Sequence, residues 1–77
     1  AQKTILITGH TCDIGGKYYN KGLSIARAKM VNDWLINEGF SKHRLRYKGK
    51  GMSEPMKANT SEENRRWNRR VVIRLND

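Results

Sequence analysis

Arg27 is the residue whose type and position most directly suggest chemistry. It lies within residues 20–35, where apolar residues recur at helical spacing, so its charge needs a partner or access to solvent. A guanidinium group can bind a carboxylate through two parallel hydrogen bonds. The helix pattern alone leaves a second interpretation open, in which Arg27 forms a surface ion pair or extends to water.

A second set of reactive residue types, His10, Cys12 and Asp13, precedes this segment. Closeness in sequence does not place a base against a nucleophile, because catalytic groups must meet in space. The other histidine, His43, has no metal-ligand spacing to His10 or Cys12. We therefore expect no enzyme activity, no metal site and no cofactor.

Positive charge dominates the composition. The 77 residues include 16 Lys and Arg against 7 Asp and Glu, which gives a net charge of +9. This excess favours an anionic partner such as nucleic acid, acidic lipid or an acidic polymer. Residues 65–70 combine four arginines with Trp67, which is one footprint of nucleic-acid binding. A small basic nucleic-acid-binding domain is therefore an alternative function.

Periodicity and turn residues predict five elements in the order strand, helix, strand, helix, strand. Their expected ranges are residues 4–8, 20–35, 45–48, 61–67 and 71–75. This order predicts an α+β fold, a two-layer α/β sandwich in which helices cover one face of a small mixed sheet. The strands before and after the long helix should be parallel, as in a β-α-β unit. Residues 1–77 have the length of a single domain.

The long helix is the best-supported element. Its predicted apolar stripe consists of Leu23, Ala26, Met30, Val31, Trp34 and Leu35. The helix should begin within residues 17–21, where Asn20 or Ser24 could cap its first turn, and Gly39 suits the position after its end.

The second, shorter helix has a capping-box pattern that runs from Thr60 to Glu63. Trp67 is expected to anchor this helix by packing. Both Trp34 and Trp67 are expected in the core rather than as platforms for stacking bases.

Four blocks of residues occur in a specific order along the chain. They are Gly9–Thr11; Asn20, Leu23, Ser24, Arg27, Ala28, Val31 and Leu35; Gly49, Gly51 and Pro55; and Asn59, Ser61, Glu63, Arg65, Asn68, Arg69, Arg70 and Val71. In these residues the chain resembles the OmpA-like domain, the peptidoglycan-binding module of outer-membrane anchors, Pal lipoproteins and MotB-type flagellar-motor stator proteins. The resemblance covers nearly the whole chain.

This resemblance implies noncovalent binding of the diaminopimelate residue of the peptidoglycan stem peptide. Such binding would anchor an outer-membrane protein to the cell wall, at the periplasmic face of the outer membrane of a Gram-negative bacterium. The resemblance implies that Arg27 meets a ligand carboxylate and that Arg69 lies near the ligand carboxylates. It also implies that Thr11, Asn20 and Leu23 shape the pocket.

The chain departs from the family pattern in two places. The family aspartate that meets the ammonium of diaminopimelate corresponds to Cys12, and Asp13 follows it. Either Asp13 takes this role, helped by the backbone freedom of Gly15 and Gly16, or ligand choice is weakened or altered. The family's first strand and helix are also absent, so we expect an N-terminally truncated fragment of a larger protein. Its last strand, residues 71–75, should then expose an edge that favours a homodimer or a swapped partner.

Overall fold

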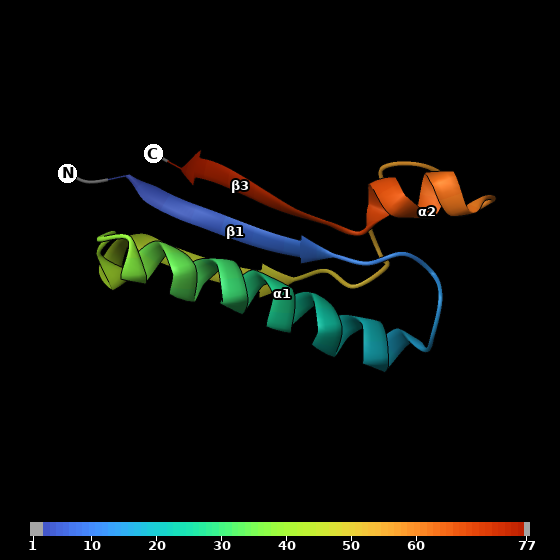
Figure 1. Ribbon diagram of the computed structural model, residues 1–77, viewed down its shortest axis with the longest axis horizontal. Coiled ribbons are helices and arrows are strands. Elements are labelled where there is room, and N and C mark those ends of the chain that lie inside the picture. The colour runs from blue at the N-terminus through green and yellow to red at the C-terminus, as the bar shows by residue number, and fades with distance from the viewer. Residues whose placement is uncertain (1–2, 77) are drawn as a thin grey trace.

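The computed structural model describes residues 3–76 and follows the predicted order of elements (Figure 1). The strands are β1 (Thr4–His10), β2 (Leu45–Gly49) and β3 (Arg70–Asn76). The helices are α1 (Lys17–Asn37), the short 3₁₀ helix η1 (Lys42–Arg44) and α2 (Glu62–Asn68). The predicted α+β class is confirmed, and the ends of the predicted elements are displaced by only a few residues.

β1 is the central strand of a mixed sheet with the order β2-β1-β3. It pairs in parallel with β2 and antiparallel with β3, so the parallel pair predicted around the long helix is confirmed. α1 packs against β1 and β2 on one face of the sheet (Figure 1). α2 lies beyond the end of the sheet, where it contacts the loop that follows β1. We call the face opposite α1 the open face.

Alternation along β1 divides its side chains between the two faces. Ile5 and Ile7 are buried against α1, whereas Leu6, Thr8 and His10 belong to the open face. The rest of the apolar core consists of Ala28, Leu35 and Leu45, with Val31 and Val71 packed at its margin.

The face that α1 turns toward the sheet differs from the predicted apolar stripe. Its buried residues are Asn20, Ser24, Ala28, Asn32 and Leu35. Met30 and Trp34, both predicted in the core, are 73% and 59% exposed. The prediction is wrong because the helix crosses the sheet closely: a Cβ added to Gly9 or Gly49 would lie well under 3 Å from Ser24. Small side chains fit at such a crossing and large ones do not.

Neither predicted cap residue of the long helix caps it. α1 begins at Lys17 with Gly16 at the N-cap position, and no side chain bonds to its first turn. Asn20 and Ser24 therefore lie inside the helix, where both are buried. Gly39 follows the helix with φ of +104°, which agrees with the predicted C-terminal glycine.

The cap of α2 lies one residue later than predicted. Ser61, not Thr60, is the N-cap residue, and its Oγ accepts a hydrogen bond from the backbone N of Asn64 at 3.1 Å. Thr60 contributes a weaker contact, because its Oγ1 accepts from the Asn64 side chain at 3.3 Å.

Trp67 is 55% exposed, so its predicted place in the core is also wrong. The buried residue at this end of α2 is Asn68, which is fully enclosed. Its Oδ1 accepts from the backbone N of Met56 and of Lys57, and its Nδ2 donates to Lys57 O and Asn59 Oδ1. The buried Asn68 amide, which forms hydrogen bonds with the backbone of the preceding loop, thus takes the anchoring role expected of Trp67.

β3 forms one edge of the sheet, as predicted. Ile73 and Leu75 lie on the same side of the sheet as the core but are 52% and 65% exposed, because α1 covers β1 and β2 rather than β3. Among residues 3–76, no helix combines the length and apolar character needed to cross a membrane.

Candidate functional site

Backbone hydrogen bonds join the loop after β1 to the turn after β2. Thr11 N donates to Gly51 O, and Lys50 N donates to Gly9 O, each at 2.9 Å. Ser24, a possible helix cap from its sequence position, accepts a hydrogen bond from Gly51 N at 2.8 Å through its buried Oγ. This hydroxyl therefore fixes both loops against α1.

Asn20 holds the next part of the same loop. Its side chain is almost fully buried, and Nδ2 donates to Ile14 O at 3.0 Å and more weakly to Gly15 O at 3.4 Å. Gly15 has φ of +94°, a conformation that residues with a Cβ rarely adopt. Asn20 thus supports the loop and is not a helix cap.

A cavity of about 210 Å³ lies between this loop, the first turns of α1 and the end of α2, and we call it the helix-side cavity. It is lined by Thr11, Cys12, Ile14, Tyr19, Asn20, Leu23, Arg27 and Arg69. These include every predicted site residue except Asp13. Tyr19 was missed although it precedes Leu23 by four residues, a spacing that places both on one helix face. Ile14 is a loop residue and offers no such signal.

Two polar groups of the helix-side cavity lack partners within the described part of the chain. Thr11 is 2% exposed, and its Oγ1 has no hydrogen-bond partner. Arg27 is partly buried, and its side chain forms no hydrogen bond or ion pair with residues 3–76, so the surface ion-pair interpretation finds no support there. Leaving a buried polar group unpaired costs about 1–3 kcal/mol. Both groups therefore remain available to a ligand.

Arg69 reaches the helix-side cavity from the C-cap of α2. Its Nη1 donates to Cys12 Sγ at 3.5 Å, and its Nη2 donates to the Glu62 carboxylate. The bond to Glu62, and after it the bond to Cys12, raises the pKa of Arg69. The same bond to Arg69 lowers the pKa of Glu62. Arg69 is thus a permanent cation whose charge is partly balanced from outside the cavity.

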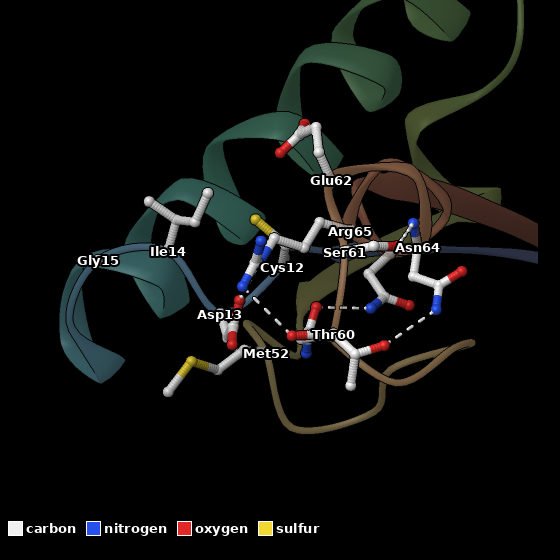
Figure 2. A network of polar contacts seen from close by, with 12 residues as sticks. Cys12, Asp13, Ile14, Gly15, Met52, Thr60, Ser61, Glu62, Asn64 and Arg65 are labelled. Atoms are coloured by element: carbon white, nitrogen blue, oxygen red, sulfur yellow. Dashed lines mark hydrogen bonds and ion pairs between the residues drawn. The ribbon is translucent and has the colours of Figure 1, made fainter.

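Asp13 does not line the helix-side cavity. Its Oδ1 accepts a hydrogen bond from Arg65 Nε at 2.9 Å, an ion pair that links the loop to α2 (Figure 2). The bond to Asp13 raises the pKa of Arg65. Consequently, the residues that line the cavity include two guanidinium groups and no carboxylate.

His10 and Cys12 diverge although only Thr11 separates them. His10 lies on the open face at the end of β1, whereas Cys12 lines the helix-side cavity. Within residues 3–76, no hydrogen bond joins the two side chains, and no three His, Cys, Asp or Glu residues gather into a possible metal site.

The fold defines the class of protein as a small α+β domain in which one long helix crosses a mixed three-stranded sheet. The chain belongs to the OmpA family, whose family model matches residues 1–69. It is 38% identical over 73 residues to outer membrane protein A of Bordetella avium, an alignment that covers 95% of this chain and 38% of that protein.

Solved structures agree with this assignment. The peptidoglycan-associated lipoprotein from Burkholderia pseudomallei matches with a TM-score of 0.93 and 28% identity, over 96% of this chain and 63% of that one. The C-terminal domain of Helicobacter pylori MotB matches with a TM-score of 0.93 and 30% identity, over 99% of this chain and 59% of that one. The chain therefore spans less than two thirds of each of these relatives.

Proposed function

We propose that this chain binds peptidoglycan noncovalently through the stem peptide and thereby anchors an outer-membrane protein to the cell wall. Two of the relatives are an outer membrane protein and a lipoprotein named for its association with peptidoglycan, which supports this function. On this proposal the domain works without catalysis, at the periplasmic face of the outer membrane of a Gram-negative bacterium.

The observation that carries the proposal is the unpartnered Arg27 guanidinium in the helix-side cavity. A partly buried cation without an ion-pair partner favours an anion, and its planar fork matches a carboxylate. Arg69 adds a second cation, and the Thr11 hydroxyl adds a group that can donate or accept. The cavity therefore suits a ligand that ends in a carboxylate.

Diaminopimelate in the stem peptide offers a carboxylate beside an ammonium group. We assign its carboxylate to Arg27, with Arg69 close by, and the walls of its pocket to Asn20 and Leu23. Cys12 is the residue of the cavity that takes the place of the family aspartate. A thiol is a weak hydrogen-bond acceptor, so the carboxylate end of the ligand should supply most of the affinity.

Nucleic-acid binding, the alternative function, gains no such observation. Within residues 65–70, Arg65 is held by Asp13 and Arg69 by Glu62, so part of the positive charge is already balanced. Duplex DNA is therefore kept as a control ligand.

Cosedimentation with insoluble peptidoglycan tests the proposal. Arg27→Gln should weaken binding at least about tenfold, because a hydrogen bond to a charged group contributes about 1.5–3 kcal/mol. Arg66→Gln makes the same change of charge at an exposed position of α2 outside the helix-side cavity, and it should bind like the wild type. If Arg27→Gln bound peptidoglycan as well as the wild type does, the proposed mechanism would be wrong. Strong binding of duplex DNA by the wild type would favour the alternative function.

We also propose that the exposed edge of β3 pairs with the same edge of a second copy of this chain. Its support is the edge position of β3 together with the exposure of Ile73 and Leu75, which belong to this strand. Sedimentation velocity at high protein concentration should show a dimer, and Ile73→Lys should shift it toward monomer, because lysine on an edge strand opposes pairing. A wild-type protein that stays monomeric contradicts this proposal.

A further inference from the structure

The open face of the sheet carries a second cavity, of about 220 Å³, which we call the open-face cavity. It shares no lining residue with the helix-side cavity. Strand register creates it: His10 lies opposite Arg70, and Lys48 lies opposite Thr8. Because side chains alternate along each strand, these residues and Arg74 emerge on the side of the sheet away from α1.

Positive charge converges on the open-face cavity from β2, β3 and the turn after β2. Its cations are Lys48, Lys50, Arg70 and Arg74, against the single carboxylate of Glu54. Glu54 approaches Lys50 only to 3.9 Å. The side chains of Lys48 and Arg74 form no hydrogen bond or ion pair with other described residues. The local charge is therefore far from balanced.

Two buried nitrogen atoms at the open-face cavity also lack partners among the described residues. His10 is 4% exposed, and its Nδ1 makes no hydrogen bond. Arg70 donates through Nη1 to Asn68 O at 3.5 Å and through Nη2 to Glu54 O at 3.2 Å, yet its buried Nε has no acceptor. These carbonyl contacts hold the guanidinium of Arg70 in place at the cavity.

A merely solvated basic face would not show this arrangement. Surface cations keep their charged ends in water, whereas here an imidazole and a guanidinium nitrogen are buried without partners. Unpaired buried polar atoms are rare because each one is costly. A ligand that supplies acceptor atoms would satisfy Arg70 Nε, and would satisfy His10 Nδ1 in the tautomer that carries its proton there. It would also balance the surrounding charge.

We propose that the open-face cavity is a binding site for a phosphate-class anion, either free phosphate or the phosphoryl group of a lipid headgroup. A phosphate carries up to two negative charges and directs its oxygen atoms to several sides, which matches donors that converge from three segments of the chain. A carboxylate has two coplanar oxygens and one negative charge, so it would engage fewer of these donors than a phosphate. The cavity holds several water-sized volumes of about 30 Å³, so a group of this size fits.

A titration with inorganic phosphate, followed by ¹H–¹⁵N NMR at constant ionic strength, tests the site. The resonances of His10 and of Arg70 Nε should shift together and saturate. Arg70→Gln should weaken binding at least about tenfold, since it removes a charged hydrogen-bond donor. Arg70→Lys keeps the charge but loses the Nε donor, so it should weaken binding as well. Arg66→Gln, which has the same loss of charge outside the cavity, should bind like the wild type.

Dispersed amide spectra will confirm that each variant is folded. Shifts that stay linear with phosphate and spread over surface lysines would overturn the proposal, as would saturable binding that Arg70→Gln leaves unchanged. Binding of duplex DNA through Arg70 without binding of inorganic phosphate would overturn it too. Cosedimentation with vesicles of phosphatidylglycerol, compared with vesicles of phosphatidylcholine, identifies the source of the phosphate group. Cosedimentation that depends on Arg70 assigns the site to a lipid headgroup. Saturable binding of inorganic phosphate without such cosedimentation assigns it to the free anion.

Discussion

The two cavities contain consecutive residues, yet they lie on opposite faces of the sheet. His10 and Thr11 are neighbours in sequence, and so are Arg69 and Arg70. Thr11 and Arg69 line the helix-side cavity, whereas His10 and Arg70 line the open-face cavity. The same two short segments, residues 10–11 and 69–70, therefore contribute to two cavities of similar size.

The cavities differ in how their arginines are held and in what surrounds them. Arg69 donates to the carboxylate of Glu62, whereas Arg70 donates to backbone carbonyl oxygens, which leave its full charge uncompensated. Ile14, Tyr19 and Leu23 give the helix-side cavity apolar walls. The first environment suits an amino-acid side chain that ends in a carboxylate, and the second suits a compact, multiply charged anion.

The largest expected effect comes from displacing α1, which lines the helix-side cavity but not the open-face cavity. In Gly9→Ala the new Cβ would collide with the backbone of Ser24, and we expect a loss of about 3 kcal/mol of unfolding free energy in urea denaturation. The displaced α1 should also reduce peptidoglycan cosedimentation, because Leu23 and Arg27 belong to it. Phosphate binding by the folded fraction should persist.

The control for this substitution lies in α1 itself. Gly22 is exposed, and a Cβ there meets nothing within 4 Å. Gly22→Ala should therefore raise the free energy of unfolding by about 1 kcal/mol through helix propensity alone. Equal stability of Gly9→Ala and the wild type would show that the close crossing of helix and sheet does not constrain this position.

A smaller effect is expected when the family carboxylate is restored to the helix-side cavity. Cys12→Asp should tighten binding of a diaminopimelate-containing stem peptide about tenfold, measured by calorimetry, because a carboxylate can pair with the ligand ammonium. Cys12→Asn, with a similar shape and no charge, should give little gain. Weaker binding by Cys12→Asp than by the wild type would contradict our placement of the ammonium.

The ion pair of Asp13 can be tested in the same assay. Arg65→Gln releases Asp13 at a cost in unfolding free energy below about 1 kcal/mol, since such partly exposed pairs contribute little. We expect stem-peptide affinity to change by less than about twofold, a small effect on the scale of RT. A gain like that of Cys12→Asp would instead show that Asp13, once free, takes the role of the family aspartate.

The smallest effect concerns His10 at the open-face cavity. Burial first, and then the nearby Arg70, lower the pKa of His10 below its usual value of 6.5; Lys50 and Arg74 lower it further, and Glu54 raises it. At pH values between the lowered pKa of His10 in the folded state and its usual pKa in the unfolded state, the unfolded chain binds the proton more readily. The stability from His10 is therefore complete above pH 6.5 and is lost as pH falls through the folded-state pKa.

Urea unfolding across this pH range measures the effect. His10→Gln should lose less stability on acidification than the wild type, whereas His43→Gln, at the exposed η1 helix, should follow the wild type. Identical pH dependence in all three proteins would show that His10 is not shielded from protons on the open face.

Local patterns in the sequence were enough to predict the order of elements, the position of α1 and the glycine at its end. These features depend on neighbours a few residues apart, which a single chain displays directly. The residue blocks around Arg27 and Arg69 also identified the family and all but two of the residues that line the helix-side cavity, Ile14 and Tyr19. The buried face of α1 was misjudged because Ser24 is polar and gives no apolar signal.

The tertiary structure alone decided that Asp13 stays outside the helix-side cavity and that cations gather at the open-face cavity. Whether Cys12 or Asp13 lines the helix-side cavity depends on Arg65, which is 52 residues from Asp13 in sequence. The cations of the open-face cavity meet only through the register of β1 with β2 and β3, which no local pattern encodes. A shift of one residue in that register would move His10 away from Arg70. Charge and residue type were readable in the sequence, and their convergence depended on long-range strand pairing.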